Sequence, residues 1–421
     1  MDRPVLDKRA TPASRPRLNC VVATPDPTFE PTPQAARRAL AAVRPSEYAR
    51  TRNRLDGAVT HLGPYITHGF LDLAEVLEHL RLRGVDAQHK LVFELGWRAW
   101  FRHVWAHEGD AIFGSLGCGP LPDEAYAREL PADVREARTG LAVIDESVRT
   151  LYRSGTLHNH ARMWLASYLV HGRKVHWRAG ADWLYGHLLD GDLASNHLSW
   201  QWVAGTGSHR PYLFNAENVE RHAPPAWHVD GSALDCSYAA LEASARDPRS
   251  VLPGGTAPGG VDEPALLDAP PAGASCQDSG FSAPDPALVA GREVWLVHPW
   301  SLADAPDDRP PDAVVVAVCD AGFHARWPWS AARWRFVGAR LREAAEVRWW
   351  GSADSIVQAL QAARRVRGRA DPHLSSAFDA LSLDPAPPAF DQPTRRCRSF
   401  SAWWAKSRCI PFQNQPELFT S

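Results

Sequence analysis

The stretch "LLDGDLASNHLSWQWVAGTGS", residues 188–208, combines carboxylates, an amide and indoles in one helical pattern. Asp192, Asn196 and Trp200 recur at steps of four residues, which places them on one stripe of a helix. Such a stripe presents hydrogen-bond acceptors, a switchable donor and a flat ring to one object. The alternative is a buried polar network beside a packed tryptophan, and the stripe taken alone favours that alternative.

A second polar group lies in "HNHARM". Asn159, Arg162 and Met163 share one helix face at spacings of three and four residues. An apolar run follows Arg162, so its guanidinium is expected in the interior, where a charge needs a partner. Asp190, Asp192 or a phosphate group would serve as that partner.

Two more segments extend the pattern. In "FELGWRAWFRH", one helix face carries Glu94, Trp97, Arg98 and Phe101. In "VTHLGPYITHG", a Gly-Pro pair at residues 63–64 precedes a helix start, where free backbone N–H groups suit an anion. Together the four segments favour a large, flat, anionic ligand in an all-helical domain. A Rossmann nucleotide site is not favoured, since no GxGxxG follows a strand.

The composition is ordinary for a globular protein: 421 residues, 45% hydrophobic, 22% charged, with a net charge of −2. Nucleic-acid binding would need a local basic groove and is not implied by the total charge. None of the seven cysteines forms a CxxC pair, so no metal site is expected. We find neither a signal-peptide pattern nor a membrane-spanning run, and we expect a cytoplasmic protein.

Shifts in composition divide the chain into five regions. The third is rich in Pro, Gly and Ala and is expected to be partly disordered. The fifth is proline-rich until "SFSAWWAKSR", residues 399–408, which is expected to dock its aromatic pair on either domain. The expected regions are a flexible arm (1–30), a helical domain (31–246), a linker (247–291), a small α/β domain (292–370) and a proline-rich, aromatic tail (371–421).

Hydrophobic periodicity predicts the elements within these regions. Gly155 is expected to end one helix and Ser330 to cap another. In the first half of the chain, helices are expected at 33–43, 71–82, 89–109, 140–155, 158–172 and 181–202. In the α/β region, strands are expected at 293–300, 312–321 and 346–352, and helices at 330–345 and 352–366.

The segment "GTLHNHARMWLASYLVHGRKVHWRAGADWLYGHLLDGDLASNHLSWQWVAGTGS" resembles the flavin-binding domain of the photolyase/cryptochrome family. The resemblance spans residues 47–215, and four motifs occur in the family's order and spacing. It implies a mainly α fold, in which an all-helical, photolyase-type FAD-binding domain precedes the linker and the small α/β domain. It also implies non-covalently bound FAD in a U-shaped conformation, and it leaves open whether an antenna chromophore binds.

The resemblance implies a role for each expected FAD contact. The turn at residues 60–63 lies at the diphosphate with Arg98 beside it, although Gly63 stands where the family usually has serine. Asp192 corresponds to the acid near flavin N1 and O2, and Asn196 faces N5. Arg162 and Asp190 resemble an ion pair near the isoalloxazine ring. The full set is Tyr48, Thr60, Leu62, Gly63, Arg98, Asn159, Arg162, Asp190, Asp192 and Asn196.

The resemblance also identifies a surface for the substrate. Cyclobutane-dimer photolyases bind and stack the lesion at four positions, and this chain retains the family identity at all of them. His160 departs from the arginine common in bacterial enzymes, which weakens the phosphate clamp. With the residue that faces N5, the expected catalytic residues are Glu94, Trp97, Met163, Asn196 and Trp202.

Three aromatic residues usually carry electrons to the flavin in this family. Trp200 and Trp177 stand at the inner and middle positions. The outer tryptophan is missing, and Tyr126 lies within about two residues of its place. A neutral tyrosyl radical at Tyr126 is therefore expected, unless another tryptophan such as Trp183 serves instead.

The order of the domains differs from the family. Members begin with an α/β antenna domain, whereas this chain begins almost directly with the helical domain. Residues 292–366 resemble that domain, so it is either relocated by circular permutation or an unrelated appendage.

The leading function is blue-light-driven repair of cyclobutane pyrimidine dimers, by a deoxyribodipyrimidine photo-lyase-like enzyme whose partner is UV-damaged DNA. The alternatives are a cryptochrome-like photoreceptor with an unknown signalling partner and a flavin-binding scaffold without either role. The lack of a basic run favours the alternatives, and the retained lesion-binding identities favour repair.

Overall fold

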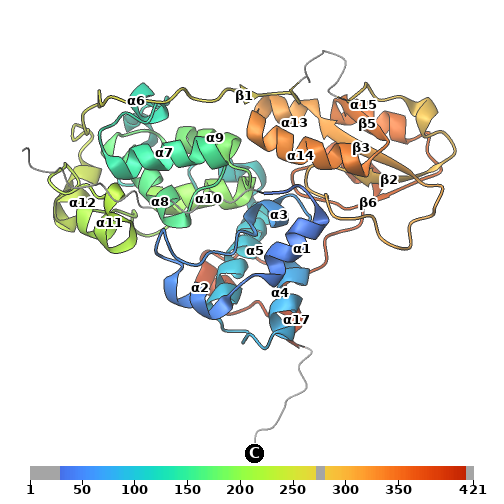
Figure 1. The fold of residues 1–421 in the computed structure, drawn as a ribbon, viewed down its shortest axis with the longest axis horizontal. Coiled ribbons are helices and arrows are strands. Elements are labelled where there is room, and N and C mark those ends of the chain that lie inside the picture. The colour runs from blue at the N-terminus through green and yellow to red at the C-terminus, as the bar shows by residue number, and fades with distance from the viewer. Residues whose placement is uncertain (1–28, 272–279, 414–421) are drawn as a thin grey trace, which may run out of the picture.

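The computed structural model describes residues 29–271 and 280–413, and it places a helical part beside a smaller part built on a parallel sheet (Figure 1). Apart from its last two residues, the arm expected at 1–30 lies outside the described residues. Within the described residues, no helix combines the length and the apolarity needed to cross a bilayer.

The helical part has the all-helical structure expected for residues 31–246, since the described chain forms no named strand there. Gly155 ends α7 in the left-handed region with φ of 65°, as expected. The helices are α1 (Pro33–Ala41), α2 (Pro45–Thr51), α3 (Gly63–Thr67), α4 (Leu73–Leu82), α5 (Lys90–Glu108), α6 (Ala132–Arg135), α7 (Ala142–Ser154), α8 (Asn159–Ser167), α9 (Trp177–His187), α10 (Leu193–Ala204), α11 (Ala216–His222) and α12 (Tyr238–Arg246).

The expected helix at 181–202 is wrong, because the chain breaks between α9 and α10. Asp192 is the N-cap of α10, and its side chain accepts a hydrogen bond from the backbone N–H of Ser195 at 2.8 Å. Gly191 permits the break, since a Cβ there would lie 2.8 Å from the carbonyl oxygen of Tyr185. Residues 188–192 therefore form a loop, which turns two carboxylates away from the helical path.

The smaller part contains four parallel strands in the order β5-β3-β2-β6. These are β2 (Glu293–Val297), β3 (Val314–Asp320), β5 (Val347–Gly351) and β6 (Arg365–Gly368). Ser330 caps α14 (Ala331–Ala344) by accepting from the N–H of Arg333, as expected. The short helix α13 (Ala321–Arg326) was not predicted from the sequence.

The expectation of a helix through residue 366 is wrong. Helix α15 (Ala353–Leu360) ends earlier, and Val366 pairs with Val294 in the sheet. The arginine-rich segment 364–369 has no strong apolar period of its own, so its pairing with β2 decides its conformation.

Alternation along the strands separates two layers of core. Leu296 and Val316 lie in a cluster with Ile356 of α15, whereas Ala317 and Cys319 lie in a cluster with Val337 of α14. The α14 side of the sheet also packs against the helical part, so its cluster extends across both parts of the molecule.

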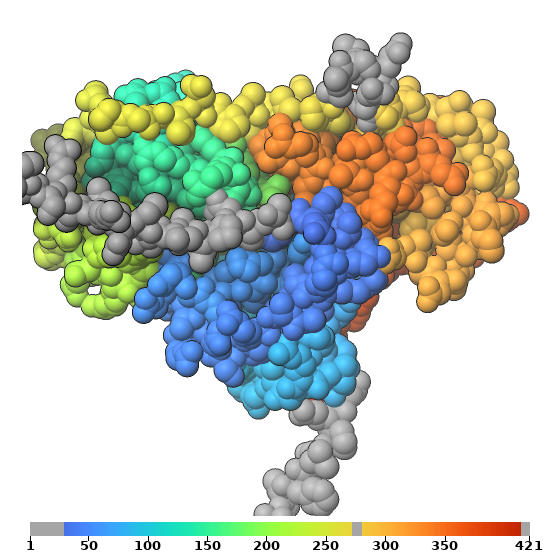
Figure 2. Space-filling view, viewed as in Figure 1, coloured from blue at the N-terminus to red at the C-terminus, as the bar shows by residue number. Residues whose placement is uncertain are grey.

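Residues 247–271 of the predicted linker form an ordered strap (Figure 2). Leu252 donates its N–H to the Gly172 carbonyl, and Val261 donates to that of Glu136. The strap ends in β1 (Leu266–Leu267), which pairs antiparallel with β4 (Trp329–Ser330). Contacts with the helices thus replace the disorder expected from composition, whereas residues 272–279 lie outside the described residues.

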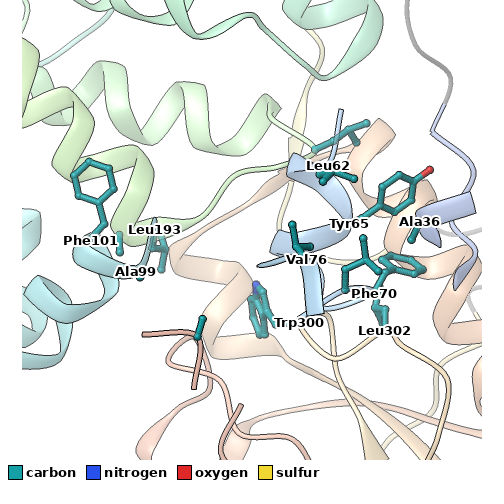
Figure 3. Packing of buried hydrophobic residues seen from close by; sticks show 14 of the residues in the cluster. Ala36, Leu62, Tyr65, Phe70, Val76, Ala99, Phe101, Leu193, Trp300 and Leu302 are labelled. Carbon is teal, nitrogen blue, oxygen red and sulfur yellow. The ribbon is translucent and has the colours of Figure 1, made fainter. Parts of the chain in front are cut away.

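The loop after β2 enters the helical part (Figure 3). Trp300 and Leu302 lie beside Phe70 and Val76 in one core. The ring of His68 connects the parts, with Nδ1 at 2.6 Å from the Pro299 carbonyl oxygen. This docking fixes the α/β part against α3 and α4, which border the candidate site.

The aromatic tail docks on the helical part. Helix α16 (Phe400–Trp404) packs against α5, and α17 (Ile410–Gln413) packs against α4. Gly96 of α5 allows the close approach, because a Cβ there would lie 2.6 Å from the Trp404 ring.

Candidate functional site

The loop between α9 and α10 is the meeting point of the sequence motifs. Its Asp190 carboxylate accepts from Nη2 of Arg162 at 2.8 and 2.9 Å, which confirms the expected ion pair. The Nε of Arg162 donates to the carbonyl of Leu157. The guanidinium of α8 is thereby fixed beside the start of α10.

Asp192 is the fully buried centre of an ion network. Its carboxylate is 0% exposed and lies 2.8 Å from Nη2 of Arg102 and 3.4 Å from Nη1 of Arg98. Burial opposes ionisation, but Arg102 and Arg98 outweigh it and hold the pKa of Asp192 well below its ordinary value. The acid therefore carries its charge at any physiological pH.

The C-terminal segment completes this network. Arg102 also donates to Asp371 at 2.8 Å, and Asp371 lies 2.6 Å from Nδ1 of His373. His373 accepts at Nε2 from the N–H of Leu193, so Nδ1 carries the ring proton and donates to Asp371. We call this set the Asp192 cluster: Arg98, Arg102, Asp192, Asp371 and His373.

Sequence reasoning missed three members of the cluster. Arg102 follows Arg98 by one helical turn, a signal that was available in the α5 pattern. Asp371 and His373 carried no such signal, because they lie in a proline-rich segment far from the motifs.

The turn before α3 approaches the same loop. Arg98 donates from Nη2 to the Thr67 hydroxyl at 2.6 Å, and Thr67 donates to the Asp190 carbonyl at 3.1 Å. A Cβ at Gly63 would lie 2.5 Å from Oδ2 of Asp190. The glycine at the family's serine position is thus matched to the close approach of Asp190.

This turn offers fewer backbone donors than the sequence suggested. The N–H of Leu62 already donates to the Thr60 hydroxyl, and Pro64 has no N–H. Tyr48, on α2, is partly buried, and burial raises the pKa of its phenol. The phenol and the Thr60 hydroxyl therefore remain available as neutral hydrogen-bonding groups on this side.

The buried stripe of α10 faces α9. Nδ2 of Asn196 donates to the Ala181 carbonyl at 2.8 Å, which leaves Oδ1 as the end of the amide that can accept. The Trp200 ring packs so closely on α9 that a Cβ at Gly180 would lie 2.3 Å from it. Trp177 lies one turn before Gly180 on the same helix, so the two tryptophans occupy neighbouring turns of one packing surface.

The expected outer electron donor lies beside this pair. Tyr126 is buried, and its ring meets that of His176 edge to face, with centroids 6.2 Å apart. Burial raises the pKa of its phenol. The alternative donor, Trp183, is buried as well and donates from Nε1 to Glu263.

The expected substrate residues lie on three helices, and α10 packs against both α5 and α8. We call Glu94, Trp97, Met163 and Trp202 the substrate face. Each of the four is only partly buried. Glu94 lies 2.9 Å from Lys90 Nζ and 3.5 Å from Arg52 Nε.

The two tryptophans of the substrate face have different surroundings. Trp97 stacks on Phe400 of the tail, with centroids 4.1 Å apart and planes 7° from parallel. The ring of Trp202 meets that of Tyr212 at 5.7 Å. One face of Trp97 is therefore occupied by the chain itself.

The start of α8 borders the substrate face. Asn159 donates to Sδ of Met163 at 3.4 Å. His160 stacks on His222 and Trp164, with Nδ1 at the Asn53 carbonyl. The histidine at the family's arginine position therefore serves here to pack α8 against neighbouring segments.

Comparison with known proteins gives matches to the helical part. Residues 91–225 match the family model described as the FAD binding domain of DNA photolyase. The chain is 36% identical over 153 residues to a deoxyribodipyrimidine photo-lyase of Streptomyces griseus, covering 36% of this chain and 33% of that protein. It is 31% identical over 173 residues to a cryptochrome DASH of Gloeobacter violaceus, covering 38% and 34%.

A further relative is matched over a longer stretch. The chain is 32% identical over 220 residues to a deoxyribodipyrimidine photo-lyase of Thermus thermophilus, covering 50% of this chain and 51% of that protein. The chain thus spans about one third to one half of the length of these curated relatives. Over residues 91–225, the helical part therefore matches the FAD-binding domain of the photolyase/cryptochrome family.

Proposed function

We propose that this protein binds FAD and uses blue light to repair cyclobutane pyrimidine dimers in DNA. The observation that carries the proposal is the substrate face: Glu94, Trp97, Met163 and Trp202 keep the lesion-binding identities on three helices, of which α10 packs against the other two. The proposal includes neither a metal ion nor a covalent bond between the protein and FAD.

The residues around the loop at 188–192 fit FAD. Asn196 keeps an amide oxygen available, and the neighbouring hydroxyl of Ser195 is buried without a hydrogen-bond partner among the described residues. A buried, unpartnered hydroxyl is uncommon and is satisfied when a ligand binds beside it. When bound, FAD supplies light absorption and one-electron chemistry, and the protein supplies position and electrostatics.

Each part of the site has a task in this proposal. Arg98, Tyr48 and the turn at residues 60–63 hold the diphosphate side. Asp192 and the Arg162–Asp190 pair orient the ring system, and Asn196 meets flavin N5. Asn159 supports the ring-system side of the site through its hydrogen bond to Met163.

On the substrate face, repair requires a dimer that is flipped out of the duplex. Trp202 and the free side of Trp97 stack on its bases, and Glu94 and Met163 hold its edge. Base stacking of this kind is worth about 1–3 kcal/mol per base. Trp200 and Trp177 then carry the electrons that keep the flavin reduced.

A cryptochrome-like photoreceptor is the second candidate. The observation that favours it is the stack of Phe400 on Trp97, because the tail there lies directly on the substrate face. A light-driven change that released α16 would turn this contact into an output signal.

We also propose that the α/β part is a relocated antenna-type domain. Numbered along the chain from β2, its four parallel strands have the spatial order 3-2-1-4, the arrangement of the first half of doubly wound folds. Whether it binds a second pigment is tested by the absorption spectrum of the purified protein, which would show a chromophore besides flavin.

The test of repair uses the reduced, flavin-loaded protein and an oligonucleotide with one cyclobutane dimer. Blue light should remove the dimer, while a matched dark sample keeps it. Light-dependent release of α16 without loss of the dimer would favour the photoreceptor instead.

A further inference from the structure

The indole of Trp177 is connected to the protein surface by hydrogen bonds. Its ring is buried, and Nε1 donates to the hydroxyl of Ser115 at 2.9 Å. Ser115 in turn donates to the carboxylate of Asp123, with its Oγ 2.9 and 3.0 Å from the two oxygens. A buried indole commonly bonds one acceptor. Here the acceptor leads on to a carboxylate that is 37% exposed.

His176 lies beside that carboxylate. Its Nδ1 accepts from the N–H of Arg178 at 3.2 Å, so the proton of the neutral ring lies on Nε2. Nε2 lies 3.3 Å from Oδ2 of Asp123. Burial lowers the pKa of His176, which keeps the imidazole neutral. The hydrogen bond that the Asp123 carboxylate accepts within this chain of groups therefore comes from the Ser115 hydroxyl.

We propose that Ser115 and Asp123 form a proton exit for Trp177. The inference rests on the proposed electron transfer from Trp177 through Trp200 to photoexcited, oxidised FAD. Neither Ser115 nor Asp123 lies on the helix stripe that would carry the electron.

The step balances in electrons and protons. Trp200 gives one electron toward the flavin, and Trp177 gives one electron that restores Trp200. The oxidised Trp177 then loses its Nε1 proton to Ser115 Oγ as the Ser115 hydroxyl proton moves to Asp123. On the protein, the products would be a neutral Trp177 radical, an unchanged serine and a protonated Asp123, which exchanges its proton with solvent, while the electron would pass to the bound flavin.

The same geometry disfavours Tyr126 as the end of the electron chain. The phenol of Tyr126 is buried; burial and the nearby charge of Asp123 raise its pKa, but within the described residues no hydrogen bond connects the phenol to that carboxylate. Oxidation of a phenol is difficult unless the proton leaves with the electron. The radical therefore rests on Trp177, where a carboxylate is connected to the ring that loses the proton.

The test is transient absorption of the flavin-loaded full chain after a blue flash, in H2O and in D2O. The visible spectrum distinguishes the protonated tryptophan radical from the neutral one. In the wild type, the neutral tryptophan radical should form with a solvent isotope effect. In Asp123→Asn and in Ser115→Ala, its formation should slow by about 100-fold, the lower end of what a positioned acid–base group contributes.

The control is Glu124→Gln, which removes the same charge from the neighbouring exposed residue and should behave as the wild type. Neutral tryptophan radical formed at the wild-type rate in both relay variants would overturn the relay, as would a tyrosyl radical that Tyr126→Phe abolishes. Trp177→Phe distinguishes a failure of the proposed electron chain from a failure of the proton relay. If that variant photoreduces flavin in wild-type yield, the electron chain of the proposed function fails. If it does not while the relay variants remain normal, only the relay fails.

Discussion

The Asp192 cluster and the substrate face share helices α5 and α10 but are built in opposite ways. In the cluster, Asp192 and His373 are completely buried and their charged or polar atoms are paired. On the substrate face, all four side chains stay partly exposed, and Glu94 forms ion pairs at the surface. A buried charge cannot lose its partner without a large penalty, whereas an exposed one can.

We infer from this contrast that the Asp192 cluster supports the fold and the cofactor, whereas the substrate face serves substrate recognition. Variants in the Asp192 cluster should change folding and cofactor retention together, because its members join α5, α10 and the C-terminal segment. Variants on the substrate face should change substrate binding while the fold and the cofactor remain.

The largest effect is expected for Asp192→Ala. The substitution removes the fully buried carboxylate that Arg98 and Arg102 share and leaves Arg98 without its acidic partner; breaking a buried pair usually costs about 3–5 kcal/mol. Urea unfolding should show this loss. The matched control is Asp56→Ala, which breaks the exposed pair with Arg54 and should change the free energy of unfolding by less than about 1 kcal/mol. Equal losses in the two variants would contradict the contrast.

Asp371→Asn should have the next largest effect, about 2 kcal/mol at neutral pH, the size of a hydrogen bond to a charged group. Burial opposes ionisation of Asp371, but Arg102 and His373 hold its pKa below the ordinary value. Its stabilising contribution is therefore complete above about pH 4, the unfolded pKa, and is lost as the pH falls through the folded pKa.

The pH dependence gives a specific measurement. Between about pH 5 and pH 2, the free energy of unfolding should fall less steeply in Asp371→Asn than in the wild type, because the variant lacks one of the depressed carboxyl groups. Parallel curves would show that Asp371 does not support the cluster.

The sequence predicted features that depend on helical periodicity, but not those that depend on tertiary contacts. The stripe of Asp192, Asn196 and Trp200 was visible because helical periodicity places residues on one face. The break at residues 188–192 was not, since it depends on the close packing of Gly191 against Tyr185 and on the Asp192 cap. The contributions of Asp371 and His373 could not be seen, because they arise from tertiary docking of a segment without periodicity.

The α/β part shows the same limit. Strands β2 and β3 were predictable from their continuous apolar runs. Strand β6 was not, because four residues of "RVRG" become a strand only through pairing with β2. The strap at 247–271 is likewise ordered by hydrogen bonds with the helical part, and amino-acid composition cannot predict such bonds.

On the substrate face, Trp202→Ala should weaken binding of a dimer-containing oligonucleotide by about tenfold or more, since stacking on one aromatic is worth about 1–3 kcal/mol. Glu94→Ala should also reduce binding or repair, and both variants should retain FAD. Trp227→Ala, in a turn that packs against α7 and α11, is the matched control and should bind as the wild type. Normal repair by both substrate-face variants would remove the basis for the proposed function.

The smallest effect is expected for Phe400→Leu. Loss of one aromatic stack is worth about 0.5–1.5 kcal/mol, so lesion binding should weaken by about two- to tenfold as Trp97 becomes less well oriented. Phe412→Leu, in α17 of the same tail, is the control that does not touch Trp97. Tighter lesion binding by Phe400→Leu would instead mean that the tail competes with the substrate.

Retention of FAD tests the central claim most directly, because every proposed step depends on a flavin beside the loop at 188–192. The measurement is the molar ratio of FAD to protein after gel filtration, for the wild type and for Asp192→Asn, with circular dichroism to show that the variant is folded. We expect a near-equimolar ratio in the wild type and a large loss in the folded variant. A wild type that does not retain FAD, or a variant that retains it at the wild-type ratio, would contradict the assignment of the site.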